Sequence, residues 1–147
     1  PRYCSLFGLV GIDVMRKNVS VAAAMIWKEG KLLICQRGAG GSCAFLWEFP
    51  GGKVECGETA LDCVIRECKE ELDIIIDVKK MIAQFDYDYP DKQISFTFFD
   101  AEILSGTVQK QVHREIRWVS PKELDSKSFC PADIEIVEQI KNQGRLS

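Results

Sequence analysis

The chain has 147 residues, of which 46% are hydrophobic and 28% charged, and its net charge is −3. This length and composition fit one soluble globular domain and exclude a disordered or membrane-embedded chain. The negative charge argues against a nucleic-acid polymer as partner, because such partners select a basic surface. A small anionic substrate would need local cations, either metal ions or a few Lys and Arg side chains.

The seven cysteines are an odd number and contain no CxxC pair. They therefore indicate neither a disulfide framework nor a zinc ribbon. We expect most of them to be buried or half-buried free thiols in a reducing cytosol, and so a cytoplasmic protein. The single histidine, His113, argues against a histidine-rich metal site.

Residues 1–14 are mostly apolar, which raises the question of a signal peptide. Asp13 interrupts the apolar run and no clear small-residue cleavage site follows, so we expect no export signal. The stretch is also too short to cross a membrane as a helix. Met15 could be a natural start. We therefore divide the chain into an N-terminal extension of open origin, 1–14, and one domain, 15–147.

The apolar pattern predicts a mixture of strands and helices without a regular βαβ alternation. Strands are expected at 19–26, 31–36, 46–49, 74–84, 93–103 and 115–119, and helices at 59–72 and from 131 to near 144. Such an order predicts an α+β fold, an α/β/α sandwich with a mixed β-sheet between helices. No internal repeat or long linker divides the chain.

The predicted helix 59–72 carries an apolar stripe, and Thr59 with Asp62 forms a plausible capping box at its start. Glu67, Glu70 and Glu71 crowd onto one of its faces, where like charges repel. A hard divalent cation would turn this repulsion into a binding site, because Mg²⁺ and similar ions prefer oxygen ligands.

The same region resembles the Nudix box, GX5EX7REUXEEXGU, where U is aliphatic. The matching positions are Gly52, Glu58, Arg66, Glu67, Glu70, Glu71 and Ile74, with Cys68 in an aliphatic position. Asp73 departs from the pattern, which has glycine there. Aspartate tolerates the left-handed conformation better than most residues, so we expect a local cost and an intact site. A motif with this many fixed positions is specific.

The resemblance implies a Nudix fold and a Mg²⁺- or Mn²⁺-dependent hydrolase. It implies that the metal is held by the carbonyl of Gly51 and the carboxylates of Glu67, Glu70 and Glu71. Water would attack a nucleoside triphosphate to give the monophosphate and pyrophosphate, with Glu70 or Glu71 accepting the proton. We assign to Arg66 an orienting ion pair, within reach of Glu58.

Segments outside the box resemble the MutT-type branch of this family. They are Leu-Trp-Glu-Phe-Pro-Gly-Gly-Lys-Val-Glu at 46–55, Gln36-Arg37, and Phe-Cys-Pro-Ala-Asp at 129–133. The resemblance implies that the substrate is bound by Arg37, Phe49, Lys53, Tyr89 and Asp133. Tyr89 could stack on a base or only cover the core. Asp133 could accept a hydrogen bond from an exocyclic amine or cap its own helix.

The Pro-Ala-Asp sequence ending at Asp133 looks more like the CTP pyrophosphohydrolase branch than like sanitisers of oxidised guanine nucleotides, which tend to carry Asn. We therefore favour CTP, dCTP or a modified pyrimidine nucleotide. The alternatives are 8-oxo-dGTP, an X-linked diphosphate such as a sugar nucleotide, and a nucleotide sensor that binds without cleaving. A small-molecule nucleotide is the expected partner, and monomer and homodimer stay open.

A second departure lies before the last predicted strand, where relatives often carry Glu-His and this chain has Val112-His113. Glu115 is the nearest candidate for an additional catalytic carboxylate, and a surface role is its alternative. His113 could be a general base, but a lone loop histidine is more often exposed. Neither Cys63 nor Cys68 has the surroundings of a nucleophile, since Cys68 lies on the apolar stripe and Cys63 adjoins Asp62.

Overall fold

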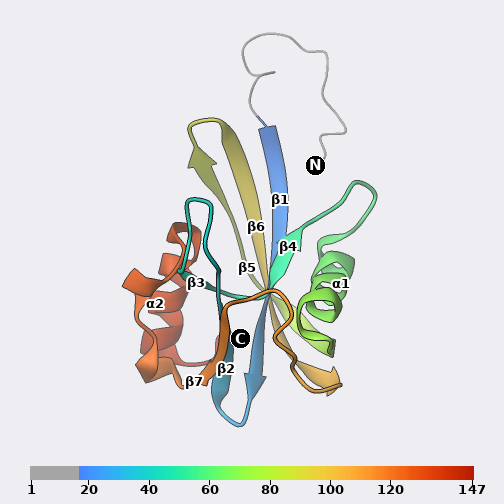
Figure 1. Cartoon of the computed structure of the whole chain (residues 1–147), viewed down its shortest axis with the longest axis vertical. Helices are drawn as coiled ribbons and strands as arrows, with labels where there is room; N and C mark the ends of the chain where they lie inside the picture. Colours follow the sequence, from blue (N-terminus) through green and yellow to red (C-terminus); the bar gives the residue numbers. More distant parts are fainter. Residues whose placement is uncertain (1–16) are drawn as a thin grey trace.

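The computed structural model describes residues 17–147, so the expected extension 1–14 and Met15 lie outside the described residues. Within residues 17–147, two α-helices and seven strands follow one another, with short 3₁₀ turns before the last helix (Figure 1). The elements are β1 (Lys17–Lys28), β2 (Lys31–Gln36), β3 (Trp47–Glu48), β4 (Gly51–Lys53), α1 (Ala60–Leu72), β5 (Ile75–Tyr89), β6 (Lys92–Ser105), β7 (Glu115–Val119), η2 (Pro121–Glu123), η3 (Ser126–Ser128), η4 (Pro131–Asp133) and α2 (Ile134–Gln143).

The strands form one mixed sheet in the order β3-β2-β1-β6-β5, with β4 paired to β1 and β7 paired to β2. β1 runs parallel to β6, and its other edge is shared between β2 and β4. The tight turn between β1 and β2 has positive φ at both Glu29 and Gly30, as a hairpin turn that follows the strand twist requires. β1 is therefore the central strand around which the other elements are arranged.

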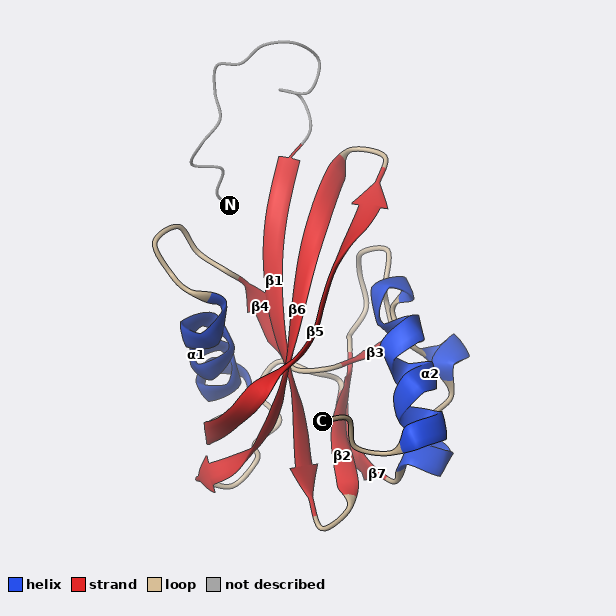
Figure 2. Cartoon of the chain, turned by 180° about the vertical axis from the view of Figure 1, so that it is seen from behind, coloured by secondary structure: helices blue, strands red, loops and turns tan. Residues whose placement is uncertain are grey.

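Helix α1 covers one face of the sheet and α2 covers the other (Figure 2). The apolar run of β1 is buried on both faces of the sheet. Ala22, Ala24 and Ile26 pack towards α1, whereas the alternate residues Met25 and Trp27 pack towards α2. A strand buried on both faces reads as a continuous apolar run. The predicted α+β sandwich with a mixed sheet between helices is confirmed.

Several predicted boundaries were too short. β5 and β6 extend to a turn at Pro90-Asp91, so Tyr89, expected in a turn, is the last residue of a strand. β4 was not predicted, because Pro50-Gly51-Gly52 was interpreted as a stop. Proline ends the pairing of β3, but the glycines then pair with β1, where a Cβ on Gly51 would lie 2.0 Å from the carbonyl oxygen of Ala22.

Among residues 17–147, no helix is long and apolar enough to span a membrane. The expectation that most cysteines are free thiols is confirmed for five described ones, whereas Cys56 is disulfide-bonded. The five are Cys35, Cys43, Cys63, Cys68 and Cys130.

Candidate functional site

Helix α1 is held at both ends by its own sequence. At its start, the side chain of Thr59 accepts a hydrogen bond from the backbone N–H of Asp62 at 3.0 Å, which is one half of the predicted capping box. At its end, Asp73 adopts the left-handed conformation (φ 57°, ψ 40°), and Lys69 pairs with its carboxylate at 2.8 Å. Asp73 therefore takes the left-handed position at the helix end that the Nudix box gives to glycine.

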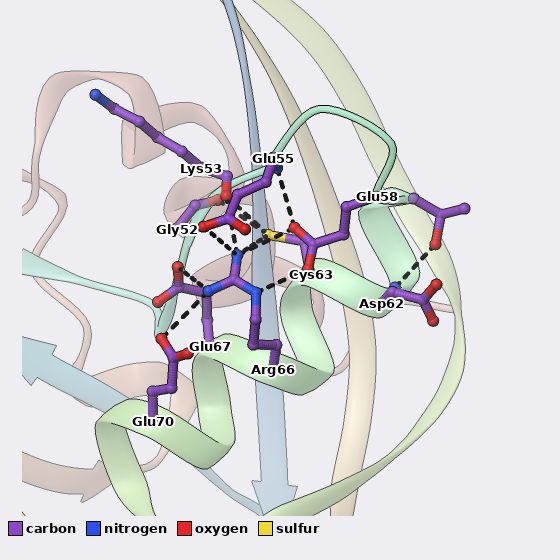
Figure 3. A network of polar contacts seen from close by, with 10 residues as sticks. Gly52, Lys53, Glu55, Glu58, Asp62, Cys63, Arg66, Glu67 and Glu70 are labelled. Atoms are coloured by element: carbon purple, nitrogen blue, oxygen red, sulfur yellow. Dashed lines mark hydrogen bonds and ion pairs between the residues drawn. The ribbon is translucent and has the colours of Figure 1, made fainter. Parts of the chain in front are cut away.

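Arg66 is the centre of a polar network on α1 (Figure 3). Its Nε and Nη2 donate to the two carboxylate oxygens of Glu58 at 2.7 and 3.0 Å, and Nη2 also reaches the carbonyl of Lys53 at 3.2 Å. Its Nη1 contacts Glu67 at 3.1 Å and Glu70 at 3.2 Å. The network lowers the pKa of Glu58 to about 2, chiefly through the hydrogen bond from Arg66. This geometry fits the orienting role predicted for Arg66.

Glu71 faces inward beside Glu67. Burial first, and then its hydrogen bond with Glu67, raises the pKa of Glu71 to about 9, and the negative charges of Glu67 and Glu48 add to the effect. Its Oε1 is buried without a hydrogen-bond partner. An unpartnered carboxylate oxygen next to a second carboxylate fits a hard divalent cation, which supplies the missing positive charge.

The predicted metal ligands are neighbours, but they do not form a ready-made cage. Within the described part of the chain, no three His, Cys, Asp or Glu side chains are arranged to hold a metal ion. Instead, Nη1 of Arg66 contacts both Glu67 and Glu70, and the Glu70 side chain is 58% exposed. Arg66 contacts one oxygen of each of these two carboxylates, Oε2 of Glu67 and Oε1 of Glu70, so the other oxygen of each could contact a cation while the Arg66 contacts remain.

The backbone of β4 lies directly against this carboxylate face. The thiol of Cys63 donates to the carbonyls of Gly52 at 3.4 Å and Lys53 at 3.3 Å, which ties β4 to α1. Burial raises the pKa of Cys63 to about 12, and burial likewise raises that of Cys68. Neither thiol is suited to act as a nucleophile, in agreement with the sequence interpretation.

A cleft of about 510 Å³ opens beside the carboxylate face. All five residues predicted to bind substrate line it, together with Gly51 and Glu71 of the predicted metal site. Those five are Arg37, Phe49, Lys53, Tyr89 and Asp133, contributed by the end of β2, the segment 49–53, the end of β5 and the turn before α2. The fold thus brings the nucleotide-binding candidates to the same cavity as two of the four metal-binding candidates, whereas Glu67 and Glu70 do not line it.

Glu48 is a cleft residue that the sequence interpretation missed. Its Oε1 lies 3.1 Å from Nη1 of Arg37, and its Oε2 lies 3.2 Å from Nε2 of His113. Strand alternation indicates part of its position: Trp47 and Phe49 pack in the core, so Glu48 turns away from that cluster, although Phe49 also lines the cleft.

The structure corrects the expectations for the two residues around the last strand. His113 was expected to be exposed, but its side chain is only 4% exposed and contacts Glu48. Glu115 was offered as a catalytic carboxylate, but it lies in β7 opposite Gln36, pairs with Arg117 at 3.1 Å and does not line the cleft. The alternative weighed for Glu115, a surface residue, fits this position better.

Asp133 is 7% exposed and is the N-cap residue of α2, but its side chain makes no capping hydrogen bond. The capping role weighed from the sequence is therefore absent. Burial, and secondarily the charge of Glu48, raises the pKa of Asp133 to about 8. At neutral pH this carboxyl group is mostly protonated, so it can donate one hydrogen bond and accept another.

The chain is similar to known proteins over most of its length. The sequence model of the NUDIX domain family matches residues 16–140. The chain is 36% identical over 122 residues to the CTP pyrophosphohydrolase of Escherichia coli K12, covering 83% of this chain and 90% of that protein. It is 34% identical over 129 residues to the 8-oxo-dGTP diphosphatase of Haemophilus influenzae, covering 87% and 95%. The solution structure of the Escherichia coli ORF135 protein superposes with a TM-score of 0.74 at 33% identity, covering 88% and 94% of the two chains.

Proposed function

The chain belongs to the Nudix domain family and is a Nudix hydrolase, and from this premise we propose that it converts nucleoside triphosphates to monophosphates and pyrophosphate. The observation that carries the proposal is the shared cleft. Glu71 of α1 and Gly51 of the proposed metal site line the cleft, and the side chains suited to a nucleotide line it as well. Phosphates and base could therefore be held at the same time.

Nudix hydrolases use divalent metal ions, and we propose Mg²⁺ or Mn²⁺ here. The carboxylates of Glu67, Glu70 and Glu71 and the carbonyl of Gly51 would hold it, since they offer only oxygen ligands. When bound, such a cation neutralises phosphate charge and makes a water molecule more acidic.

Different side chains of the protein would then bind the phosphate groups and accept the proton of the attacking water. Arg37 and Lys53 line the cleft and are suited to bind phosphate oxygens. Glu70 is the most exposed of the three helix carboxylates and is suited to accept the proton of the attacking water, directly or through a second water. Arg66 orients Glu67 and Glu70 through its contacts with both.

We favour a cytosine nucleotide because of Asp133. The Watson–Crick edge of cytosine offers an amine donor beside a ring-nitrogen acceptor. A protonated carboxyl group can accept a hydrogen bond from the amine and donate one to the ring nitrogen. Tyr89 is placed at the cleft to stack on the base, a contact worth about 1–3 kcal/mol. The alternative substrate is 8-oxo-dGTP, because several relatives bear that activity in their names.

A substrate panel with Mg²⁺ would test the proposal, comparing CTP, dCTP, 5-substituted dCTP, 8-oxo-dGTP and ADP-ribose. We expect pyrophosphate release, fastest with a cytosine nucleotide. Release of inorganic phosphate alone, or no turnover with any nucleoside triphosphate, would reject the reaction type. A preference for 8-oxo-dGTP would reject only the base assignment.

Glu70→Gln is the matching mutational test. We expect turnover to fall by about two orders of magnitude or more, because the proton acceptor is lost while the shape is kept. Asp62→Asn is the matched control, since Asp62 is an exposed carboxylate on the same helix outside the Arg66 ion pairs. Near-wild-type turnover of Glu70→Gln would remove Glu70 from the mechanism.

We further propose a cytoplasmic location, because nucleoside triphosphates are intracellular metabolites, and a monomer or homodimer. Light scattering of the purified chain would distinguish these two states.

A further inference from the structure

The only histidine of the chain has a fixed place beside the cleft. The residue after it, Arg114, donates its backbone N–H to the carbonyl of Gln36 at 2.9 Å, next to the Gln36–Glu115 pair of β2 and β7. The sheet therefore anchors the backbone of His113. Its imidazole is almost fully buried, so its direction is set by its surroundings and not by solvent.

The imidazole lies between two carboxylates from different elements. Nε2 is 3.2 Å from Oε2 of Glu48 on β3, and 3.8 Å from Oε1 of Glu71 on α1. Only the first distance is that of a weak but acceptable hydrogen bond, and the second is too long. The donor and acceptor roles in this bond depend on the imidazole tautomer; with the carboxylate of Glu48 as acceptor, the hydrogen of the bond is on Nε2.

The second oxygen of Glu48 is engaged by Arg37, whose Nη1 lies 3.1 Å from Oε1. Glu48 is therefore held on both oxygens, by His113 from one side and by Arg37 from the other. The Arg37 side chain remains 43% exposed and lines the cleft, so its other N–H groups are available to a ligand. A guanidinium fixed in this way loses less freedom when it binds a phosphate.

We propose that His113 is a positioning residue for nucleotide binding: its Nε2–H holds Glu48, and Glu48 holds Arg37 at the cleft for the phosphate groups. This inference rests on the proposed function, since it takes the ligand to be a nucleoside triphosphate. His113 does not line the cleft, and its hydrogen bond goes to Glu48, so in this proposal it acts through Glu48. Removing its donor should therefore weaken binding far more than it slows the chemical step.

The first test compares His113→Gln with His113→Phe. Glutamine can donate a side-chain N–H to Glu48, whereas phenylalanine fills the space without a donor. We expect His113→Phe to raise KM for CTP, and Kd for a non-hydrolysable CTP analogue, by about tenfold with kcat within about twofold, the size of one lost hydrogen bond to a charged group. His113→Gln should recover most of the affinity.

Two comparisons keep this test specific. Gln109→Ala, in the same loop, should bind as the wild type does, because the Gln109 side chain contacts only the carbonyl of Thr107. In a Glu48→Ala background, His113→Phe should add nothing further, because the group that transmits its effect is gone. Thermal unfolding of each variant shows whether the fold is retained.

The second test needs no nucleotide. Because the chain has one histidine, its imidazole nitrogens give one set of ¹⁵N NMR signals, and we expect the bound hydrogen on Nε2. An imidazole protonated only on Nδ1 would overturn the inference. Wild-type binding with equal affinity in the Phe and Gln variants would also overturn it while leaving the proposed function intact. If the wild type bound no nucleoside triphosphate, the inference about His113 and the proposed function would both be rejected.

Discussion

A Cβ atom added to Gly52 would lie 2.4 Å from Oε2 of Glu67. The backbone of β4 and a carboxylate of α1 are therefore in direct contact, with no room for a methyl group between them. The glycine is required by this close approach and not by its backbone angles, since Gly52 has no positive φ. The contact fixes the distance between the turn after β3 and the carboxylate face of the helix.

Gly52→Ala should therefore displace Glu67 and impair catalysis. We expect kcat/KM to fall by at least about tenfold, because a misplaced ligand or catalytic group of this kind costs one or more orders of magnitude. The measurement is pyrophosphate release at saturating and limiting nucleotide. Gly38→Ala is the matched control, since a Cβ there would meet nothing within 4 Å and the φ of Gly38 is not positive. Equal activity of the two variants would show that Glu67 can move without consequence.

Stability should depend on pH through Glu71. Burial, followed by the influence of Glu67, raises its folded-state pKa from 4.5 to about 9. The folded state then binds more protons than the unfolded state, so this contribution is complete below pH 4.5 and is lost as pH rises through about 9. Without divalent cations, we expect the free energy of urea unfolding to decrease from pH 5 to pH 9.

Glu71→Gln removes this titration and should make the decrease shallower. Asp133, whose pKa is also raised, contributes with the same sign, so part of the decrease should remain. Adding Mg²⁺ should raise the Tm of the wild type more at pH 8.5 than at pH 6, since the ionised carboxylate is the form that binds the cation. An unchanged pH slope in Glu71→Gln would place the titrating group elsewhere.

The sequence predicts a residue of this site when a local pattern, such as helical spacing or a motif, indicates its role. Glu67, Glu70 and Glu71 were predicted because helical spacing places them together, Arg66 matches the Nudix box, and the resemblance to the family implied the carbonyl of Gly51. Strands β2 and β7 were predicted to the residue, because turn residues bound their apolar patterns. These features are local, so a single sequence carries them.

The residues that were misjudged act across the fold. His113 and Glu48 are 65 positions apart, and neither has a sequence pattern that indicates burial or pairing. Glu115 was chosen as the glutamate nearest to Val112, but it lies in β7, pairs with Arg117 and does not line the cleft. β4 was missed because its glycines were interpreted as a stop. They form a strand only by pairing with β1, whose backbone a glycine can approach closely.

Base recognition should depend on the protonation of Asp133. Its pKa is raised to about 8, so the hydrogen that it can donate is lost as pH rises past that value. We expect KM for CTP to increase between pH 7 and pH 9. Asp133→Asn cannot ionise and should remove this increase, whereas Asp133→Ala should lower kcat/KM by about 5- to 150-fold, the cost of about 1–3 kcal/mol for a lost base contact.

A further variant distinguishes this effect from a general effect of pH. The negative charge of Glu48 is one cause of the raised pKa of Asp133, so Glu48→Gln should move the rise in KM to lower pH. The KM of ATP, whose base edge differs, serves as the comparison at each pH. The same pH dependence in the wild type and Asp133→Asn would show that another group controls base binding.

The thiol of Cys63 should stabilise the junction of β4 and α1. It donates to the carbonyls of both Gly52 and Lys53, and the second of these also accepts from Arg66. Cys63→Ala leaves the Gly52 carbonyl without this donor, so we expect a loss of about 1–3 kcal/mol in the free energy of unfolding. Cys63→Ser is the matched control, because its hydroxyl is also a donor and should retain part of the stability. If serine and alanine were equally destabilising, the contribution of Cys63 would come from packing in the core and not from its contacts with β4.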